Sequence, residues 1–119
     1  MNAAVIEIKD VLRRLQDDRE LLVELVKIFL DDAPTGFKRA EQLIGQGNFS
    51  ALLDTAHSLK GAAANIGAQK LSRSFCEIEE AAKQKEILRV REAFENASSE
   101  LAELKRYFPK LKEQLARRP

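Results

Sequence analysis

The sequence predicts an all-α protein, an up-and-down four-helix bundle with an additional N-terminal helix or helices. Apolar residues recur at intervals of three and four residues along almost the whole chain, as on the buried face of an α-helix. No stretch of six or more residues alternates between apolar and polar side chains, which is the pattern of a half-buried strand. Glycine and proline number only five and three, and they punctuate the chain instead of filling it.

The first part of the chain predicts three helices. The first spans about residues 6–16, and Asp17 or Asp18 then offers an N-cap for the second, because a carboxylate there accepts hydrogen bonds from free N–H groups of the first turn. This second helix ends near Asp32. Pro34 suits the first turn of a third helix, where its missing N–H costs nothing, and the glycines that follow end that helix.

The remainder of the chain predicts three more helices. Asn48 is an N-cap for a helix over about 49–66, and the next helix covers about 69–84. A long helix starts near Glu86, and its apolar residues keep a seven-residue period, as on the inner face of a bundle helix. Pro109 predicts a kink or break in it. Since the connections are short, neighbouring helices are expected to pack antiparallel.

Composition narrows the classes of protein. The 119 residues suit a single domain spanning 1–119. The net charge is +1, which excludes the strongly basic character typical of nucleic-acid binding. The apolar stretches are too short to cross a membrane, and the N-terminus lacks a signal-peptide pattern. The single cysteine cannot form a disulfide within the chain, so a reducing cytoplasm is the expected location. A monomer is expected, because the helices can bury their apolar faces against one another.

The single histidine, His57, is the candidate functional residue. It follows Ala56, which belongs to the apolar stripe, so it lies about 100° around the helix, on its shoulder and not in the core. Lys60 and Gly61 follow three and four residues later, on the same side. A glycine within a helix costs about 0.5–1 kcal/mol relative to alanine. Here it removes a side chain that would crowd the imidazole.

A second candidate comes from the antiparallel arrangement of the helices on either side of Ala68. Residues equidistant from this position lie side by side, and this pairs His57 with Glu79. Glu79 can then accept a hydrogen bond from Nδ1–H of the imidazole, which leaves Nε2 unprotonated. Lys83 lies one turn beyond Glu79 and reaches toward the same region.

This arrangement suits phosphoryl transfer. A neutral imidazole, with a pKa of about 6.5, can attack a phosphoryl group and form a phosphohistidine. Lys60 would offset the incoming negative charge, with Lys83 as a second cation. The chain has no phosphate-binding glycine loop and no acidic cluster around His57, so no cofactor is expected, and the donor and Mg²⁺ must come from a partner. The expected docking surface comprises Leu53, Gly61, Ala64 and Ala68.

The sequence resembles the histidine-containing phosphotransfer (HPt) domain family over about residues 8–115. The main motif reads His-x-Leu-Lys-Gly, then small residues, then Ile-Gly. A second stretch, FLDDAP at 29–34, and a helix over 71–82 with Glu79 at the level of the histidine are also similar to such domains. The motif residues are His57, Leu59, Lys60, Gly61, Ile66 and Gly67.

The resemblance implies a phosphocarrier with no catalytic activity of its own. Its histidine takes a phosphoryl group from a receiver aspartate or from a kinase and passes it to another receiver. The expected partners are therefore response-regulator receiver domains, a sensor histidine kinase, or both. Nucleic acid and membranes are not expected partners. Two alternatives stay open. The bundle could be a structural adaptor with an inert His57, or the phosphoacceptor module of a larger chemotaxis-type or hybrid kinase.

Overall fold

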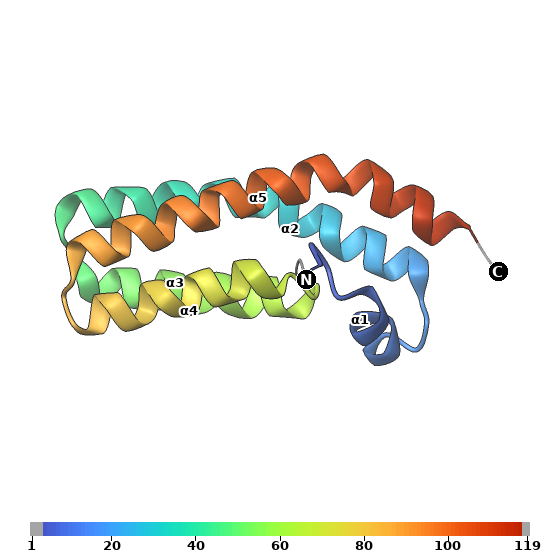
Figure 1. Ribbon diagram of the computed structural model, residues 1–119, viewed down its shortest axis with the longest axis horizontal. Helices are drawn as coiled ribbons and strands as arrows, with labels where there is room; N and C mark the ends of the chain where they lie inside the picture. Colours follow the sequence, from blue (N-terminus) through green and yellow to red (C-terminus); the bar gives the residue numbers. More distant parts are fainter. Residues whose placement is uncertain (1–3, 118–119) are drawn as a thin grey trace.

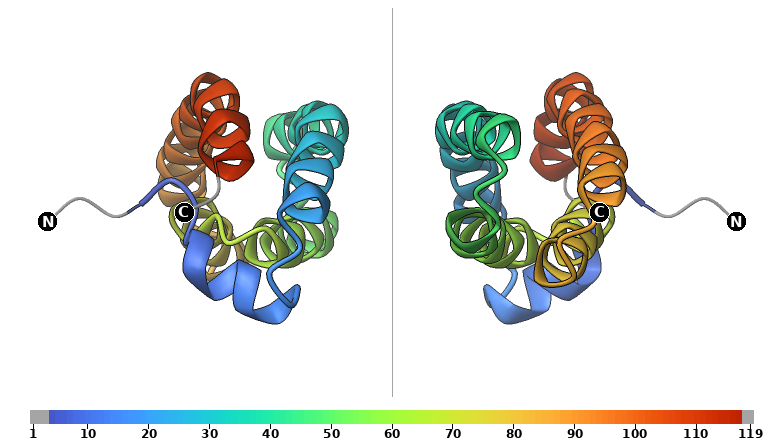
Figure 2. Two further views of the ribbon diagram at one scale, coloured as in Figure 1. Left: turned by 90° about the vertical axis from the view of Figure 1, so that its right-hand side faces the viewer. Right: turned by 90° about the vertical axis from the view of Figure 1, so that its left-hand side faces the viewer.

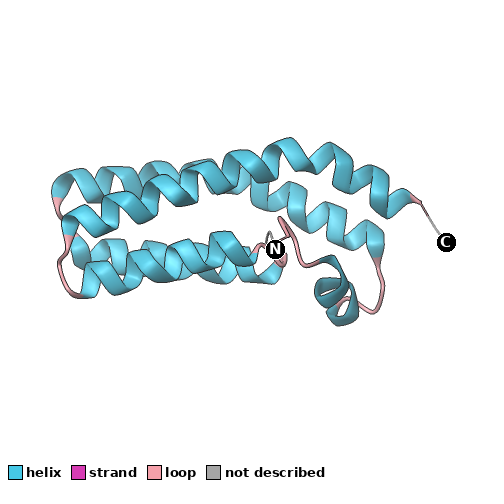
Figure 3. Cartoon of the chain, in the orientation of Figure 1, coloured by secondary structure: helices cyan, strands magenta, loops and turns pink. Residues whose placement is uncertain are grey.

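The computed structural model describes residues 4–117 as a bundle of helices (Figures 1 and 3). No strand occurs among these residues, which confirms the predicted all-α class. None of their helices is long and apolar enough to span a lipid bilayer. The helices are α1 (Ile8–Arg14), α2 (Arg19–Gln46), α3 (Phe49–Asn65), α4 (Gln69–Lys83) and α5 (Ile87–Ala116).

The helices α2, α3, α4 and α5 form the bundle, and the short helix α1 covers part of one end. Seen end-on, α2 lies over α3 and α5 lies over α4, with α3 and α4 side by side (Figure 2). The longer helices α2 and α5 extend past the turn between α3 and α4, and α1 lies beside that turn (Figure 1). The up-and-down four-helix bundle with an additional N-terminal helix is therefore the observed architecture.

The helix α2 differs from the prediction, because Pro34 lies inside it. The sequence predicts two helices that meet at this proline, and that boundary is wrong, because α2 runs unbroken for 28 residues. A proline in a helix interior costs about 3 kcal/mol, partly through a lost backbone hydrogen bond. Pro34 is exposed, whereas Phe29, Ala33 and Phe37 beside it are buried in the core. Continuous burial of this face offsets the local cost.

The helix α5 also contains a proline. It continues through Pro109 for a total of 30 residues, so the break considered in the sequence analysis is absent. Its axis changes direction toward the C-terminal end (Figure 1), as helix prolines commonly cause. The predicted apolar stripe forms its inner face. The buried members of that stripe are Val90, Ala97, Leu101, Leu104, Leu111 and Leu115.

Capping residues set the ends of the helices that carry the site. Asp18 accepts a hydrogen bond from the Leu21 N–H at the start of α2, and Asn48 does the same for Ala51 at the start of α3. Gly67, just past α3, has a φ of +76°. A Cβ at this glycine would overlap the Val11 side chain of α1. Gly67 therefore does more than terminate α3, since it also allows α1 to pack against the turn.

Candidate functional site

His57 stands on the exposed side of α3. Its side chain is 73% exposed, whereas the preceding Ala56 is buried in the core. This is the shoulder position that the helical spacing predicted. The backbone of α3 is held by core contacts on its other side, so the imidazole is presented to solvent from a rigid support.

Glu79 of α4 lies against the imidazole. Its Oε2 atom is 3.5 Å from Nδ1 of His57, a separation at the outer limit of a hydrogen bond. His57 and Glu79 face each other across the α3–α4 turn, as counting from Ala68 predicted, and the role of Glu79 in orienting the ring stays a prediction. The carboxylate faces Nδ1, so Nε2 is the ring nitrogen left available for chemistry.

The same carboxylate pairs with Lys60. Nζ of Lys60 lies 2.7 Å from the other oxygen, Oε1, of Glu79. The contact is an ion pair between an ammonium group and a buried carboxylate. It raises the pKa of the Lys60 ammonium above its usual value. The sequence had placed Lys60 near the imidazole but had not indicated that it shares Glu79 with His57.

The burial of Glu79 explains this pairing. The residue is only 9% exposed, and a carboxylate removed from water is costly unless a cation or hydrogen-bond donors compensate it. Lys60 supplies the cation, and His57 supplies a ring nitrogen on the other side. The three side chains therefore form one electrostatic unit, with a buried anion at its centre and an exposed imidazole at its edge.

Gly61 leaves open space next to His57. Outside the neighbouring backbone of α3, no atom of the described residues lies within 4 Å of the position that a Cβ would take at Gly61. The absence of a side chain at this glycine is therefore not required by packing inside the protein. That is consistent with the predicted clearance for an approaching partner.

Lys83 is exposed at the last position of α4 and forms no ion pair with any residue in the described part of the chain. Its proposed role stays a prediction.

The predicted docking surface needs one correction. Ala68 is only 3% exposed, because it lies in the tight turn between α3 and α4 and packs inward. It cannot line a docking surface. Leu53 and Ala64 are half-buried and Gly61 is exposed, so these three remain available at the surface of α3.

A groove between α2 and α3 was not predicted. It encloses about 650 Å³. Its floor passes Gly36, whose missing side chain allows Leu59 of α3 to approach closely. The available signal in the sequence was the surplus of apolar residues in α2, of which Ile28 is 47% exposed. The main apolar lining residues are Leu25, Ile28, Phe29, Ala33, Leu59 and Ala62.

The described side chains offer no evident metal centre. Within residues 4–117, no group of three or more His, Cys, Asp or Glu side chains is arranged to hold a metal ion. The chemistry available from the site itself is therefore that of an exposed imidazole, a buried carboxylate and an ammonium group. An exposed imidazole of this kind can hold a phosphoryl group on nitrogen.

Comparison with known proteins extends these observations. The family profile of the Hpt domain matches residues 24–117. The fold is similar to that of histidine-containing phosphotransfer protein B (HptB) from Pseudomonas aeruginosa PAO1, with a TM-score of 0.83, 27% identity, and coverage of 95% of this chain and 98% of that one. A rice protein assigned to the histidine-containing phosphotransfer proteins has a TM-score of 0.79 at 24% identity, over 96% of this chain and 86% of the other. A search of curated proteins finds no match.

Proposed function

Because this chain belongs to the Hpt domain family and is a histidine phosphotransfer protein of a phosphorelay, we propose that His57 is the residue that carries its phosphoryl group. The observation that supports this assignment is the 73% exposure of the His57 side chain beside the buried carboxylate of Glu79. His57 is also the only histidine in the sequence. The phosphorelay chemistry of this chain therefore has one candidate acceptor.

The transfer step uses the free ring nitrogen. The Nε2 lone pair of His57 attacks the phosphorus of a receiver aspartyl phosphate, the bond between phosphorus and the carboxylate oxygen breaks, and the aspartate leaves as a carboxylate. The ring keeps its Nδ1 proton and gains positive charge. Glu79, at 3.5 Å from Nδ1, stabilises that charge and fixes the orientation of the ring. The return step reverses these bonds.

Lys60 compensates the incoming phosphoryl group, which brings about two negative charges. Its ammonium is paired with Glu79 before transfer. Once the imidazole ring becomes positive, Glu79 gains a second cationic partner, and Lys60 can turn toward the phosphoryl oxygens. Lysine is protonated at physiological pH, and the contact with Glu79 raises the pKa of Lys60 further.

The partner supplies the rest of the machinery. We assign no cofactor to this chain, and the Mg²⁺ that neutralises charge in transfer belongs to the receiver domain. The partners are response-regulator receiver domains, a sensor histidine kinase, or both. The receiver docks over Gly61 and the α2/α3 groove, since these are the open and apolar surfaces next to His57. We place this exchange in the cytoplasm.

The direct test is labelling with a phosphorylated receiver domain, or with a kinase and ATP. The proposal expects a label that resists alkali, is lost in acid, and is absent from the His57→Gln variant. Retention of the label in His57→Gln would move the acceptor elsewhere. Binding of receivers with no label from any donor would instead favour the adaptor interpretation, in which the histidine is inert.

A further inference from the structure

The walls of the α2/α3 groove carry an unbalanced negative charge. Asp32 of α2 and Asp54 of α3 are its only charged lining residues, and both are exposed. Neither forms an ion pair with any other residue between 4 and 117. The groove therefore presents an apolar floor between two uncompensated carboxylates, one on each wall.

We propose that Asp32 and Asp54 select among receiver domains, favouring those that present an apolar helical ridge flanked by Lys or Arg. A groove between two helices accepts the ridge of a third helix. Cations on the flanks of that ridge would meet both carboxylates, whereas anions there would be repelled. This inference rests on the proposed function, since it names the chemistry of the partner that the His57 site exchanges with.

The position of the groove relative to the imidazole supports this assignment. At about 100° per residue, Gly61 lies between His57 and Asp54 around the exposed side of α3. Ser58, next to His57 in sequence, lines the groove. A partner seated in the groove therefore reaches the imidazole by passing over Gly61, where no side chain stands in its way.

The size of the effect follows from the exposure of the two carboxylates. Charges at the rim of an interface act mainly on the association rate and on discrimination between partners, and they are screened by salt. Each aspartate is expected to change the transfer rate by about threefold, and both together by about tenfold. The apolar floor favours partners with an apolar ridge, and the carboxylates then discriminate among such partners by the charges beside that ridge.

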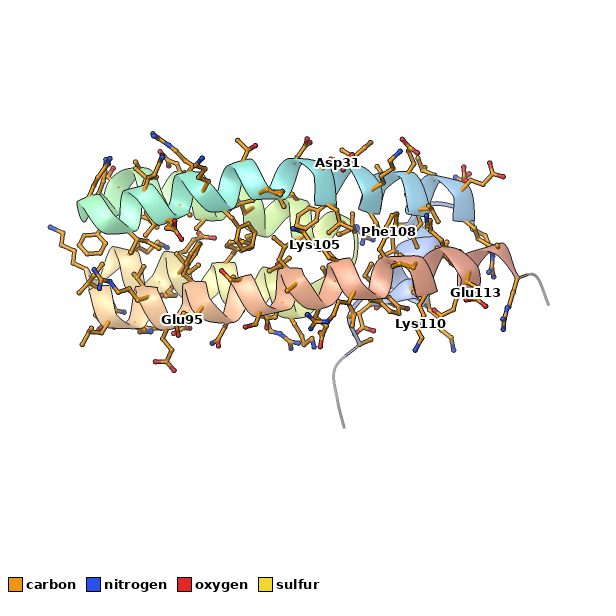
Figure 4. The ribbon with its side chains drawn as sticks, turned by 90° about the horizontal axis from the view of Figure 1, so that it is seen from above. Asp31, Glu95, Lys105, Phe108, Lys110 and Glu113 are labelled. Carbon is orange, nitrogen blue, oxygen red and sulfur yellow. The ribbon has the colours of Figure 1, made fainter. Side chains whose placement is uncertain are left out.

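The test compares transfer rates from phosphorylated His57 to a panel of purified receiver domains. The variants are Asp32→Asn, Asp54→Asn, the double variant, and a charge-reversed Asp32→Lys/Asp54→Lys protein. Asp31→Asn is the matched control, because Asp31 is an exposed neighbour on α2 (labelled in Figure 4) that does not line the groove. Helical circular dichroism checks that each variant folds. Labelling by phosphoramidate, which needs no docked protein, checks that His57 remains reactive.

The expected result is a change in preference. The receivers that the wild type labels fastest should carry Lys or Arg beside an apolar helical face, and the double Asn variant should lose about tenfold with them. The Lys variant should gain with receivers that carry acidic residues there. Raising the salt to about 0.3 M should reproduce the loss in the wild type but change the double variant little.

Two outcomes overturn the inference, and they are distinguishable. If the double variant and Asp31→Asn label every receiver at the wild-type rate, charge selection is wrong, while the carrier function stands. If phosphoramidate labels His57 but no receiver accepts the group from any protein in the series, the proposed function fails and takes the inference with it.

Discussion

The carboxylate of Glu79 joins two functional side chains, with Oε2 at 3.5 Å from Nδ1 of His57 and Oε1 at 2.7 Å from Nζ of Lys60. The carboxylate is buried, and both of its partners come from α3. One anion therefore contacts both the imidazole and the ammonium group. This relationship makes separate predictions for each of the three residues.

Replacing Glu79 by Gln keeps the shape of the side chain but removes its charge. The amide can still accept a hydrogen bond from Nδ1–H, but it no longer balances the positive charge on the ring or on Lys60. We expect phosphoryl transfer to slow by about tenfold to a hundredfold, as for loss of one charge-assisted contact to a reacting group. Single-turnover transfer rates measure this. Glu80→Gln, at an exposed neighbouring position, is the control and should transfer normally.

Replacing Lys60 by Ala removes the cation, so that the buried carboxylate of Glu79 keeps only its contact with the His57 ring. Transfer should slow, and the melting temperature should fall, because an uncompensated buried carboxylate destabilises the fold. The double variant Lys60→Ala/Glu79→Gln should recover stability but not transfer. Thermal unfolding followed by circular dichroism separates the two effects. Equal transfer rates in Lys60→Ala and the wild type would remove Lys60 from the mechanism.

The Lys60–Glu79 pair also predicts a dependence of stability on alkaline pH. The pairing raises the pKa of Lys60 above its usual value of 10.5. A group with a raised folded pKa contributes stability that is fully present below its unfolded pKa and is lost as pH rises through the folded one. Stability should therefore decline above about pH 10.5. Tyr107, whose pKa is raised by burial, acts in the same direction.

Comparison with Lys60→Met isolates the contribution of the lysine. Denaturant unfolding at about pH 9 and about pH 11.5 gives the loss of stability for each protein. The loss of stability between these pH values should be smaller in Lys60→Met, because Tyr107 is then the remaining one of the two groups with a raised pKa. An identical loss in both proteins would show that the ion pair does not contribute to stability in solution.

Replacing Gly61 by Leu tests whether the open surface beside His57 is needed for docking. A Cβ at Gly61 meets no described atom within 4 Å, and the same holds at Gly45 of α2, so Gly45→Leu is a matched control. Both changes should preserve or slightly raise stability, by about 0.5–1 kcal/mol, because glycine is a poor helix former. Only Gly61→Leu should block transfer from a receiver. Unchanged transfer in Gly61→Leu would show that clearance at this position is unnecessary.

Replacing Gly67 by Ala tests the packing of α1. Gly67 has a left-handed φ of +76°, and an added Cβ would overlap Val11. The control, Gly47→Ala, has a φ of +65° and no described neighbour within 4 Å. Gly47→Ala should cost about 1 kcal/mol from backbone strain alone. Gly67→Ala should cost at least about 2 kcal/mol, as measured by denaturant unfolding, and equal costs would contradict the role of Gly67 in seating α1.

The sequence alone was sufficient for the class of fold, the acceptor candidate and the identity of its neighbour Glu79, whereas the burial of Glu79 was not predicted. Apolar periodicity defines which face of each helix is buried, and that places His57 on the shoulder of α3. The pairing with Glu79 was predictable because α3 and α4 are joined by a short turn. Two antiparallel helices so closely connected have their register set locally, so counting from Ala68 was enough.

Contacts between helices distant in sequence were decided only by the tertiary structure. Local rules place a helix boundary at Pro34, yet its neighbours on α2 pack against α3, α4 and α5, and this packing carries α2 through the proline. The same packing brings Leu25 and Ile28 of α2 beside α3 to form a groove. The spacing of residues along one helix determines the direction in which each side chain points. The burial of that side chain and the residues it contacts depend on which other helices pack against its own helix. For that reason the acidic walls of the groove, Asp32 and Asp54, emerged only from the assembled bundle.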